Sequence, residues 1–192
     1  MTRHARSGGG LPGEVRLIGG QWKRSKLPVA DRPGLRPTPD RVRETLFNWL
    51  GQDLAGWHVL DAFAGSGALG FEAASRGAAE VLLLERDATL VRSLSEVKAR
   101  LKADAVQVLA ADAMAWLKRC TPERFELVLL DPPFDSDVFD AALVAAVPTV
   151  VPGGFIYLEA PRVFDAPPSG VALHRHLRAG AVHAHLFVRS QG

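Results

Sequence analysis

From residue 57 onward, short apolar runs alternate with segments of helical periodicity, and this alternation limits the folds open to the chain more than any other feature. The apolar runs lie at 59–62, 80–84, 105–109, 125–130 and 155–158, and the helical segments between them lie at 69–76, 88–102, 113–118 and 138–146. Runs that are almost continuously apolar are typical of parallel strands covered on both faces by helices. The pattern therefore predicts an α/β, Rossmann-like fold in which right-handed crossovers build a mostly parallel sheet.

The C-terminal residues follow a different pattern. Two runs with strand character, 171–177 and 182–188, are joined near Gly180 and predict an antiparallel hairpin. With the five earlier runs, this hairpin gives a seven-stranded, mostly parallel sheet with helices on both faces. Four histidines alternate along the hairpin, but Cys120 is the only cysteine and few carboxylates lie nearby, so we expect no metal site.

Length and composition exclude several classes of protein. At 192 residues, with 47% hydrophobic and 23% charged residues, the chain is expected to form about one globular domain that needs no disulfide. No apolar run approaches the ~18 residues of a membrane span, and no signal-peptide core follows the first arginines. We therefore expect a cytoplasmic protein with no membrane partner, and a monomer by default.

Charge is distributed unevenly along the chain. The first 48 residues hold ten basic and four acidic residues, whereas the rest holds 13 basic and 17 acidic residues. A basic segment on a mildly acidic body is typical of a protein that binds a polyanion at one end. Residues 1–14 are predicted to be a flexible basic leader, and residues 15–56 an RNA-binding extension of strand, loop and helix. The candidate RNA contacts are Lys23, Arg24, Lys26, Arg36, Arg41 and Arg43.

Within this extension, residues 15–18 have strand character, and the prolines of residues 26–37 predict an extended loop. A helix is then expected, because Thr38 can cap it, Pro39 suits its first turn and Asp40 complements its positive end. Its apolar face is formed by Val42, Leu46, Trp49 and Leu50. Arg41 and Arg43 lie off that face, which is why they are candidates for RNA binding.

A glycine-rich sequence, Gly65-Ser66-Gly67-Ala68-Leu69-Gly70, connects the predicted strand 59–62 to the next helix. It matches the G-x-G-x-x-G dinucleotide fingerprint, a weak pattern that its place between a strand and a helix strengthens. Asp61 discriminates between cofactors, because a carboxylate at this strand end would repel a pyrophosphate and attract a cation. S-adenosylmethionine carries a sulfonium and an ammonium group and has no phosphate. We therefore predict this cofactor, held at Asp61, Phe63, Gly65, Ser66 and Gly67.

Acidic residues also follow the next two strands. Glu85, next to Arg86, can accept hydrogen bonds from both ribose hydroxyls, as it would for a nicotinamide cofactor as well. Asp112 can accept from the adenine amino group, while the amide of Ala113 meets a ring nitrogen. Asp112 can equally cap the following helix, and the two roles can coexist. Glu85, Arg86, Asp112 and Ala113 complete the predicted cofactor site.

The sequence Asp131-Pro132-Pro133-Phe134 leaves the fourth strand at its carboxyl end, where ligands bind in open α/β sheets. The two prolines stiffen the backbone and expose carbonyl acceptors, and Asp131 adds a side-chain acceptor. Acceptors that hold both hydrogens of a planar exocyclic amine can aim its lone pair at a methyl sulfonium. Phe134 can stack on the base. These four residues are the predicted catalytic site for direct methyl transfer, without a metal or a covalent intermediate.

Together these motifs resemble those of class I S-adenosylmethionine-dependent methyltransferases that act on an exocyclic amine. Residues 16–29 (RLIGGQWKRSKLPV) and 35–50 (LRPTPDRVRETLFNWL) more specifically resemble the bacterial RsmD family of 16S rRNA guanine-N2 methyltransferases. The resemblance covers almost the whole chain from Arg16 and implies a class I methyltransferase fold at 57–192. It also implies one target guanine in an assembled or assembling 30S subunit, with Asp131 to Phe134 at the target amine. The one departure is Pro39, where the family usually has Thr, and proline suits a first helical turn.

Other functions stay open at this point. The Asp-Pro-Pro-aromatic loop also fits an adenine-N6 or cytosine-N4 methyltransferase acting on DNA or RNA. The N-terminal signature and the lack of a separate target-recognition domain in 192 residues argue against that alternative. Asp61 argues against a nicotinamide-dependent oxidoreductase, because its carboxylate would repel the pyrophosphate of that cofactor. A catalytically silent factor that binds rRNA would share the extension and differ from an enzyme only in methyl transfer.

Overall fold

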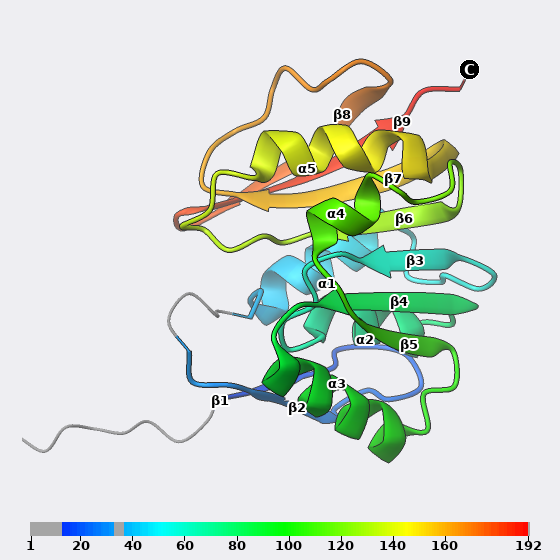
Figure 1. Ribbon diagram of the computed structural model, residues 1–192, viewed down its shortest axis with the longest axis vertical. Helices are drawn as coiled ribbons and strands as arrows, with labels where there is room; N and C mark the ends of the chain where they lie inside the picture. The colour runs from blue at the N-terminus through cyan, green and yellow to red at the C-terminus, as the bar shows by residue number, and fades with distance from the viewer. Residues whose placement is uncertain (1–12, 33–36, 192) are drawn as a thin grey trace, which may run out of the picture.

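A seven-stranded sheet with the strand order β5-β4-β3-β6-β7-β9-β8 runs through the computed structural model, which describes residues 13–32 and 37–191 (Figure 1). Strands β3 to β7 pair in parallel, and β9 lies antiparallel between β7 and β8. The strands are β3 (His58–Asp61), β4 (Glu80–Glu85), β5 (Val106–Ala110), β6 (Phe125–Leu130), β7 (Val150–Ala160), β8 (Val171–Ala179) and β9 (Val182–Arg189). The predicted α/β fold, with a seven-stranded, mostly parallel sheet and a C-terminal hairpin, is confirmed.

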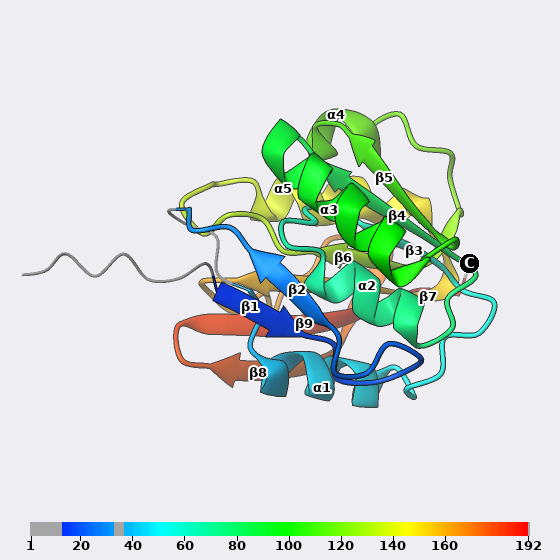
Figure 2. The ribbon, with the colours of Figure 1, turned by 90° about the horizontal axis from the view of Figure 1, so that it is seen from below.

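Helices cover both faces of this sheet (Figures 1 and 2). One face carries α4 (Ala113–Leu117) and α5 (Phe139–Ala146), which the short 3-10 helix η1 (Val147–Thr149) joins to β7. The opposite face carries α1 (Asp40–Trp49), α2 (Ala68–Ser75) and α3 (Ala88–Leu101). Among the described residues, no helix is long and apolar enough to cross a membrane.

The core explains why the parallel strands are almost continuously apolar. Successive residues of a strand point to opposite faces of the sheet. In β6, Leu127 and Leu129 pack into the cluster beneath α1, α2 and α3, whereas Val128 and Leu130 pack into the cluster beneath α4 and α5. Because both faces are buried, both sets of positions need apolar side chains.

The N-terminal extension differs from the prediction in its strands. A two-stranded antiparallel sheet pairs β1 (Gly13–Arg16) with β2 (Lys26–Val29), so residues 26–29 are a strand and not a loop. Gly13 and Glu14, assigned to the flexible leader, are in register with Val29 and Pro28. Each strand of a two-stranded sheet keeps one open side, which tolerates a proline. Residues 1–12, the rest of the predicted leader, lie outside the described residues.

Helix α1 begins at Asp40 and buries Val42 and Leu46, as its periodicity predicts. The predicted cap is wrong, because Pro39 occupies the N-cap position and no side chain caps the helix. The Thr38 hydroxyl donates instead to Glu159 at 2.6 Å, 121 residues away in β7. The extension therefore reaches the carboxyl edge of the main sheet at this point.

Candidate active site

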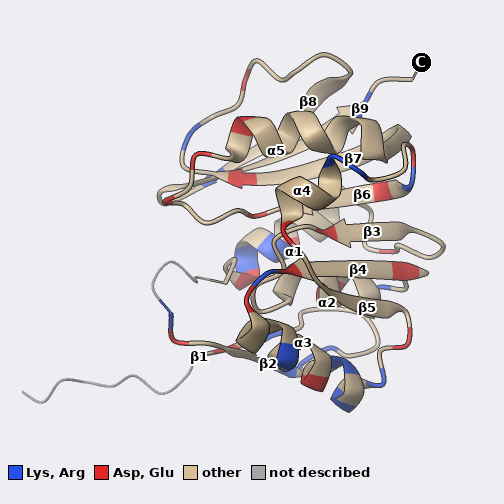
Figure 3. Ribbon diagram, in the orientation of Figure 1, with Lys and Arg blue, Asp and Glu red and all other residues tan. Residues whose placement is uncertain are grey.

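A cleft of about 690 Å³ opens at the carboxyl ends of β3, β4, β6 and β7. Acidic residues end β3 and β4, and others lie within one residue of the ends of β6 and β7 (Figure 3). Pro37, Thr38 and Pro39 of the extension line one side, and the tip of the β8–β9 hairpin lines another. The cleft brings together twelve of the thirteen predicted catalytic and cofactor-binding residues: Asp61, Phe63, Gly65, Ser66, Glu85, Arg86, Asp112, Ala113, Asp131, Pro132, Pro133 and Phe134.

The exception is Gly67, which shapes the glycine-rich loop without lining the cleft. It is the N-cap of α2 at φ +80°, and a Cβ there would lie 2.6 Å from the Phe71 ring. Gly70, the last glycine of the motif, lets α2 approach β4, since a Cβ would lie 2.2 Å from Leu83. Of the three motif glycines, only Gly65 lines the cleft, and the other two make the turn and the helix–strand packing fit.

Asp61 is buried at the end of β3 and is only half satisfied. Its Oδ2 accepts a hydrogen bond from the Gly70 amide at 3.0 Å, whereas Oδ1 accepts none from any described residue. Burial, with a smaller contribution from Glu85, raises the pKa of this carboxyl to about 7. A buried acceptor without a donor that lines a cleft is suited to a cationic or donor-bearing ligand.

Glu85 and Asp112 organise the backbone around the cleft. Glu85 accepts from the Gly65 amide at 3.0 Å and from the Asp87 amide at 2.9 Å, so it fixes the glycine-rich loop relative to β4. Asp112 caps α4 by accepting from the Ala115 amide at 2.8 Å, and it also lines the cleft. The structure therefore contains the capping interaction, and the predicted contacts of both residues with a nucleoside stay predictions.

Three carboxyl groups lie close together at the start of the Asp131–Phe134 loop. Burial raises the pKa of Asp131 well above its ordinary value, and the neighbouring Glu159 and Asp61 raise it further. Burial also raises the pKa of Glu159, although hydrogen bonds from Thr38 and Tyr157 oppose that effect. Carboxyl groups this close resist full ionisation together, so a cation in the cleft would stabilise their charged forms.

The loop after Asp131 presents one aromatic ring. Phe134 is 40% exposed and packs edge-on against Phe139, with the ring centroids 6.4 Å apart. The carbonyl of Pro133 already accepts hydrogen bonds from both the hydroxyl (2.6 Å) and the amide (3.0 Å) of Ser136. The acceptors left for a target amine are therefore nearer Asp131.

Sequence reasoning missed Thr38, Tyr157 and Glu159 as members of this site. Glu159 directly follows the apolar run 155–158. Asp61 and Glu85 were chosen as candidates because they end apolar strands, and the same criterion would have found Glu159. Tyr157 points to the same face two residues earlier and donates to Glu159 at 2.8 Å. Thr38 carried no such signal, since only the tertiary fold brings it to β7.

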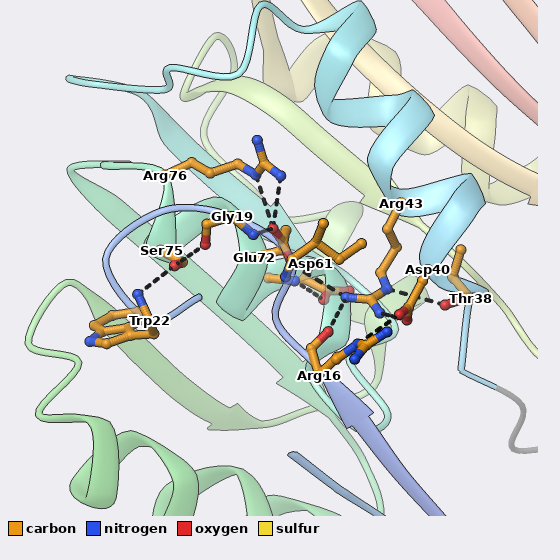
Figure 4. A network of polar contacts seen from close by, with 12 residues as sticks. Arg16, Gly19, Trp22, Thr38, Asp40, Arg43, Asp61, Glu72, Ser75 and Arg76 are labelled. Atoms are coloured by element: carbon orange, nitrogen blue, oxygen red, sulfur yellow. Dashed lines mark hydrogen bonds and ion pairs between the residues drawn. The ribbon is translucent and has the colours of Figure 1, made fainter. Parts of the chain in front are cut away.

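One of the predicted RNA contacts, Arg43, is not accessible to RNA. Its side chain is fully buried, so the expectation that it binds RNA is wrong. Its guanidinium donates to the carbonyls of Arg16 (2.9 Å) and Thr38 (3.1 Å) and pairs with Asp40 (2.5 Å) and Glu72 (3.3 Å) (Figure 4). This arginine fixes α1 to β1 and α2.

Glu72 in α2 supplies the negative charge that compensates the buried guanidinium of Arg43. Its oxygens also accept from the amides of Ile18 (2.9 Å) and Gly19 (2.8 Å) and pair with Arg76 at 3.0 Å (Figure 4). A buried carboxylate with two cations and two amides is fully compensated. The network fastens the extension to the helix that follows the glycine-rich loop.

The other predicted RNA contacts differ in accessibility. Lys23, Arg24 and Arg41 are exposed, and Lys26 is exposed with an ion pair to Glu14 at 2.8 Å. Lys23 also lines a second hollow of about 810 Å³, between the extension and the end of α2. Arg36 lies outside the described residues. Contact of the exposed residues with RNA stays a prediction.

The histidines of the C-terminal hairpin form a stacked group. His176 and His183 lie 3.0 Å apart between ring nitrogens, and buried His185 bonds to the Phe164 amide and the Leu158 carbonyl. Burial is the main cause that lowers the pKa of His185, to about 4. Within the described part of the chain, no group of three or more His, Cys, Asp or Glu residues is placed to hold a metal ion.

Comparison with known proteins gives concordant results. The family described as conserved hypothetical protein 95 matches residues 15–188. Ribosomal RNA small subunit methyltransferase D of Escherichia coli K12 is 43% identical over 182 residues, which cover 92% of this chain and 91% of that protein. Its Haemophilus influenzae counterpart is 40% identical, covering 91% and 94%. The solved structure of yhhF from Escherichia coli, named as a methyltransferase, superposes with a TM-score of 0.83 at 41% identity, covering 94% and 100%.

Proposed function

Because the chain belongs to the family described as conserved hypothetical protein 95, which is the RsmD family, we propose that it methylates the exocyclic N2 of a guanine in 16S rRNA. The methyl donor is S-adenosylmethionine. The observation that carries the proposal is the single cleft that holds the Asp61 loop and Asp131-Pro132-Pro133-Phe134 together. A cofactor site beside an acceptor-rich, aromatic loop is what methyl transfer to an aromatic amine requires.

The residues of the cleft fit S-adenosylmethionine, which supplies a methyl group on a cationic sulfur. The unpartnered Oδ1 of Asp61 is suited to a charged donor group of this molecule. Gly65 lets the backbone approach closely, and the half-buried Glu85 lies at the adjoining strand end, in reach of ribose hydroxyls. Asp112 and Ala113 also line the cleft, and we expect them to contact the adenine.

The catalytic loop holds the target amine. In the transfer, the N2–methyl bond forms as the sulfur–methyl bond breaks, and one proton leaves the nitrogen. In its ionised form Asp131 accepts a hydrogen bond from the amine and takes that proton, and the raised pKa of this carboxyl makes its ionised form a stronger base. Phe134, exposed over the cleft, stacks on the base once the base is unpaired.

The extension supplies the RNA surface. Exposed Lys23, Arg24 and Arg41 contact phosphates, which gives affinity without reading sequence. The substrate is 16S rRNA within the 30S subunit or an assembly intermediate, and the enzyme acts as a cytoplasmic monomer.

A paired substitution tests this assignment. Asp131→Ala should reduce transfer of labelled methyl groups to small subunits that lack the modification by more than about 100-fold, because it removes the acceptor for the amine. Asp135→Ala is the matched control, since Asp135 is exposed in the same loop. Cofactor affinity, measured by calorimetry, should stay within a few-fold in both variants. Near wild-type turnover in Asp131→Ala would refute the proposed role.

A further inference from the structure

A second carboxylate stands beside Asp131 and has no part in the mechanism above. Glu159 is 3% exposed near the carboxyl end of β7, and it lines the same cleft as Asp131 and Phe134. Asp131 and Glu159 are close enough to affect each other's ionisation, as Asp131 and Asp61 are. A buried carboxylate that faces a ligand cleft has a high cost unless a partner compensates it.

The hydrogen bonds of Glu159 leave one oxygen available to a ligand. Its Oε1 accepts from the Thr38 hydroxyl at 2.6 Å and from the Tyr157 hydroxyl at 2.8 Å. No described residue donates to Oε2. Two hydroxyls on Oε1 fix the orientation of the carboxylate, because each hydroxyl has a single hydrogen to donate. The group is therefore held in place on one side and unpaired on the other.

Guanine has the complementary edge. Its N2 amine lies next to N1–H, so two adjacent ring positions present only hydrogen-bond donors. We propose that Oε2 of Glu159 accepts the hydrogen bond from N1–H while Asp131 accepts from the N2 amine, which makes Glu159 the residue that selects guanine. This inference rests on the proposed function, since it names the base atom read in the same site.

The same arrangement rejects the other amino bases. In adenine and cytosine, the ring nitrogen beside the amine is an acceptor, and it would face the carboxylate oxygen with no hydrogen between them. A site built to bond a donor discriminates strongly against a ligand that lacks it, because buried polar groups are left unpaired. Glu159 thus separates guanine-N2 chemistry from adenine-N6 or cytosine-N4 chemistry, which the Asp-Pro-Pro-aromatic loop alone does not.

Glu159→Gln is the informative substitution. The amide oxygen takes the two hydroxyl donors, so the NH2 group replaces Oε2 and presents a donor to N1–H. We expect kcat/KM for guanine to fall about 10- to 100-fold, since a hydrogen bond to a charged group is lost. Small subunits reconstituted with 2-aminopurine at the target position retain the amine but have an acceptor at N1. The ratio of kcat/KM on the 2-aminopurine substrate to kcat/KM on the guanine substrate should be at least tenfold higher in the variant than in the wild type.

Matched measurements make the test decisive. Glu96→Gln, on the exposed side of α3, is the control and should behave as wild type on both substrates. Calorimetric affinity for S-adenosylmethionine reports whether Glu159→Gln keeps its folded cleft. Unchanged guanine turnover, or equal loss on both bases, would overturn the inference while leaving the proposed function intact. Failure of the wild type to label guanine would overturn both.

Discussion

Arg43→Met tests whether Arg43 is a buried structural residue, as the structure shows, or an RNA contact, as the sequence pattern predicts. The guanidinium of Arg43 is fully buried and bonds to two carbonyls and two carboxylates, so its loss leaves Glu72 with one cation fewer in the interior. Removing one partner of a buried ion pair costs about 3–5 kcal/mol of unfolding free energy. For a chain of this size, each kcal/mol corresponds to about 2–4 °C in Tm, so Tm should fall by about 6–20 °C.

The control for this experiment lies two residues away. Arg41 is exposed on the same helix, and Arg41→Met should change the unfolding free energy by less than about 0.5 kcal/mol. Urea unfolding followed by circular dichroism gives both values, and RNA binding at several salt concentrations gives the number of phosphate contacts. A wild-type unfolding free energy for Arg43→Met, together with a reduced salt slope, would show that Arg43 contacts RNA and would refute the buried assignment.

Three further predictions concern the cofactor, the extension and the RNA. Affinity for S-adenosylmethionine should rise about eightfold from pH 6 to 7.5, because Asp61, with a pKa of about 7, becomes ionised over that range, and Asp61→Asn should abolish the change in calorimetry. Gly20→Ala should lower the unfolding free energy by much more than Gly51→Ala does. Both have positive φ, but only at Gly20 would a Cβ meet backbone, 1.8 Å from the Ser75 oxygen, and urea unfolding compares the two. Arg41→Ala should reduce the slope of log affinity against log salt by about 1, measured on small-subunit RNA, and an unchanged slope would remove Arg41 from the RNA surface.

The main sheet could be predicted because its information is local. Each strand of the parallel part contains an almost continuous apolar run, and the helices between strands have their own periodicity, so the sequence of elements and the fold class can be predicted. The cleft follows as well, since the carboxyl ends of parallel strands meet at one edge, which places Asp61, Glu85 and Asp131 together.

The errors involve residues whose environment depends on distant segments. Arg43 looks like a surface residue on a helical wheel, and only the burial of α1 against α2, with Glu72 as partner, makes it internal. Thr38 has the sequence context of a helix cap, yet a carboxylate 121 residues away takes its hydroxyl. Local patterns contain no information about such partners, which is why the Arg43–Glu72 network and the position of Thr38 were missed. Glu159 differs, because an acidic residue directly after the apolar run 155–158 is a local signal that could have been used.

The most direct test of the account identifies the modified nucleoside. Small subunits from cells that lack this gene would be incubated with the protein and isotope-labelled S-adenosylmethionine, and the rRNA would be digested and analysed by mass spectrometry. We predict that the label appears in N2-methylguanosine. Label in N6-methyladenosine or N4-methylcytidine would contradict the proposed function.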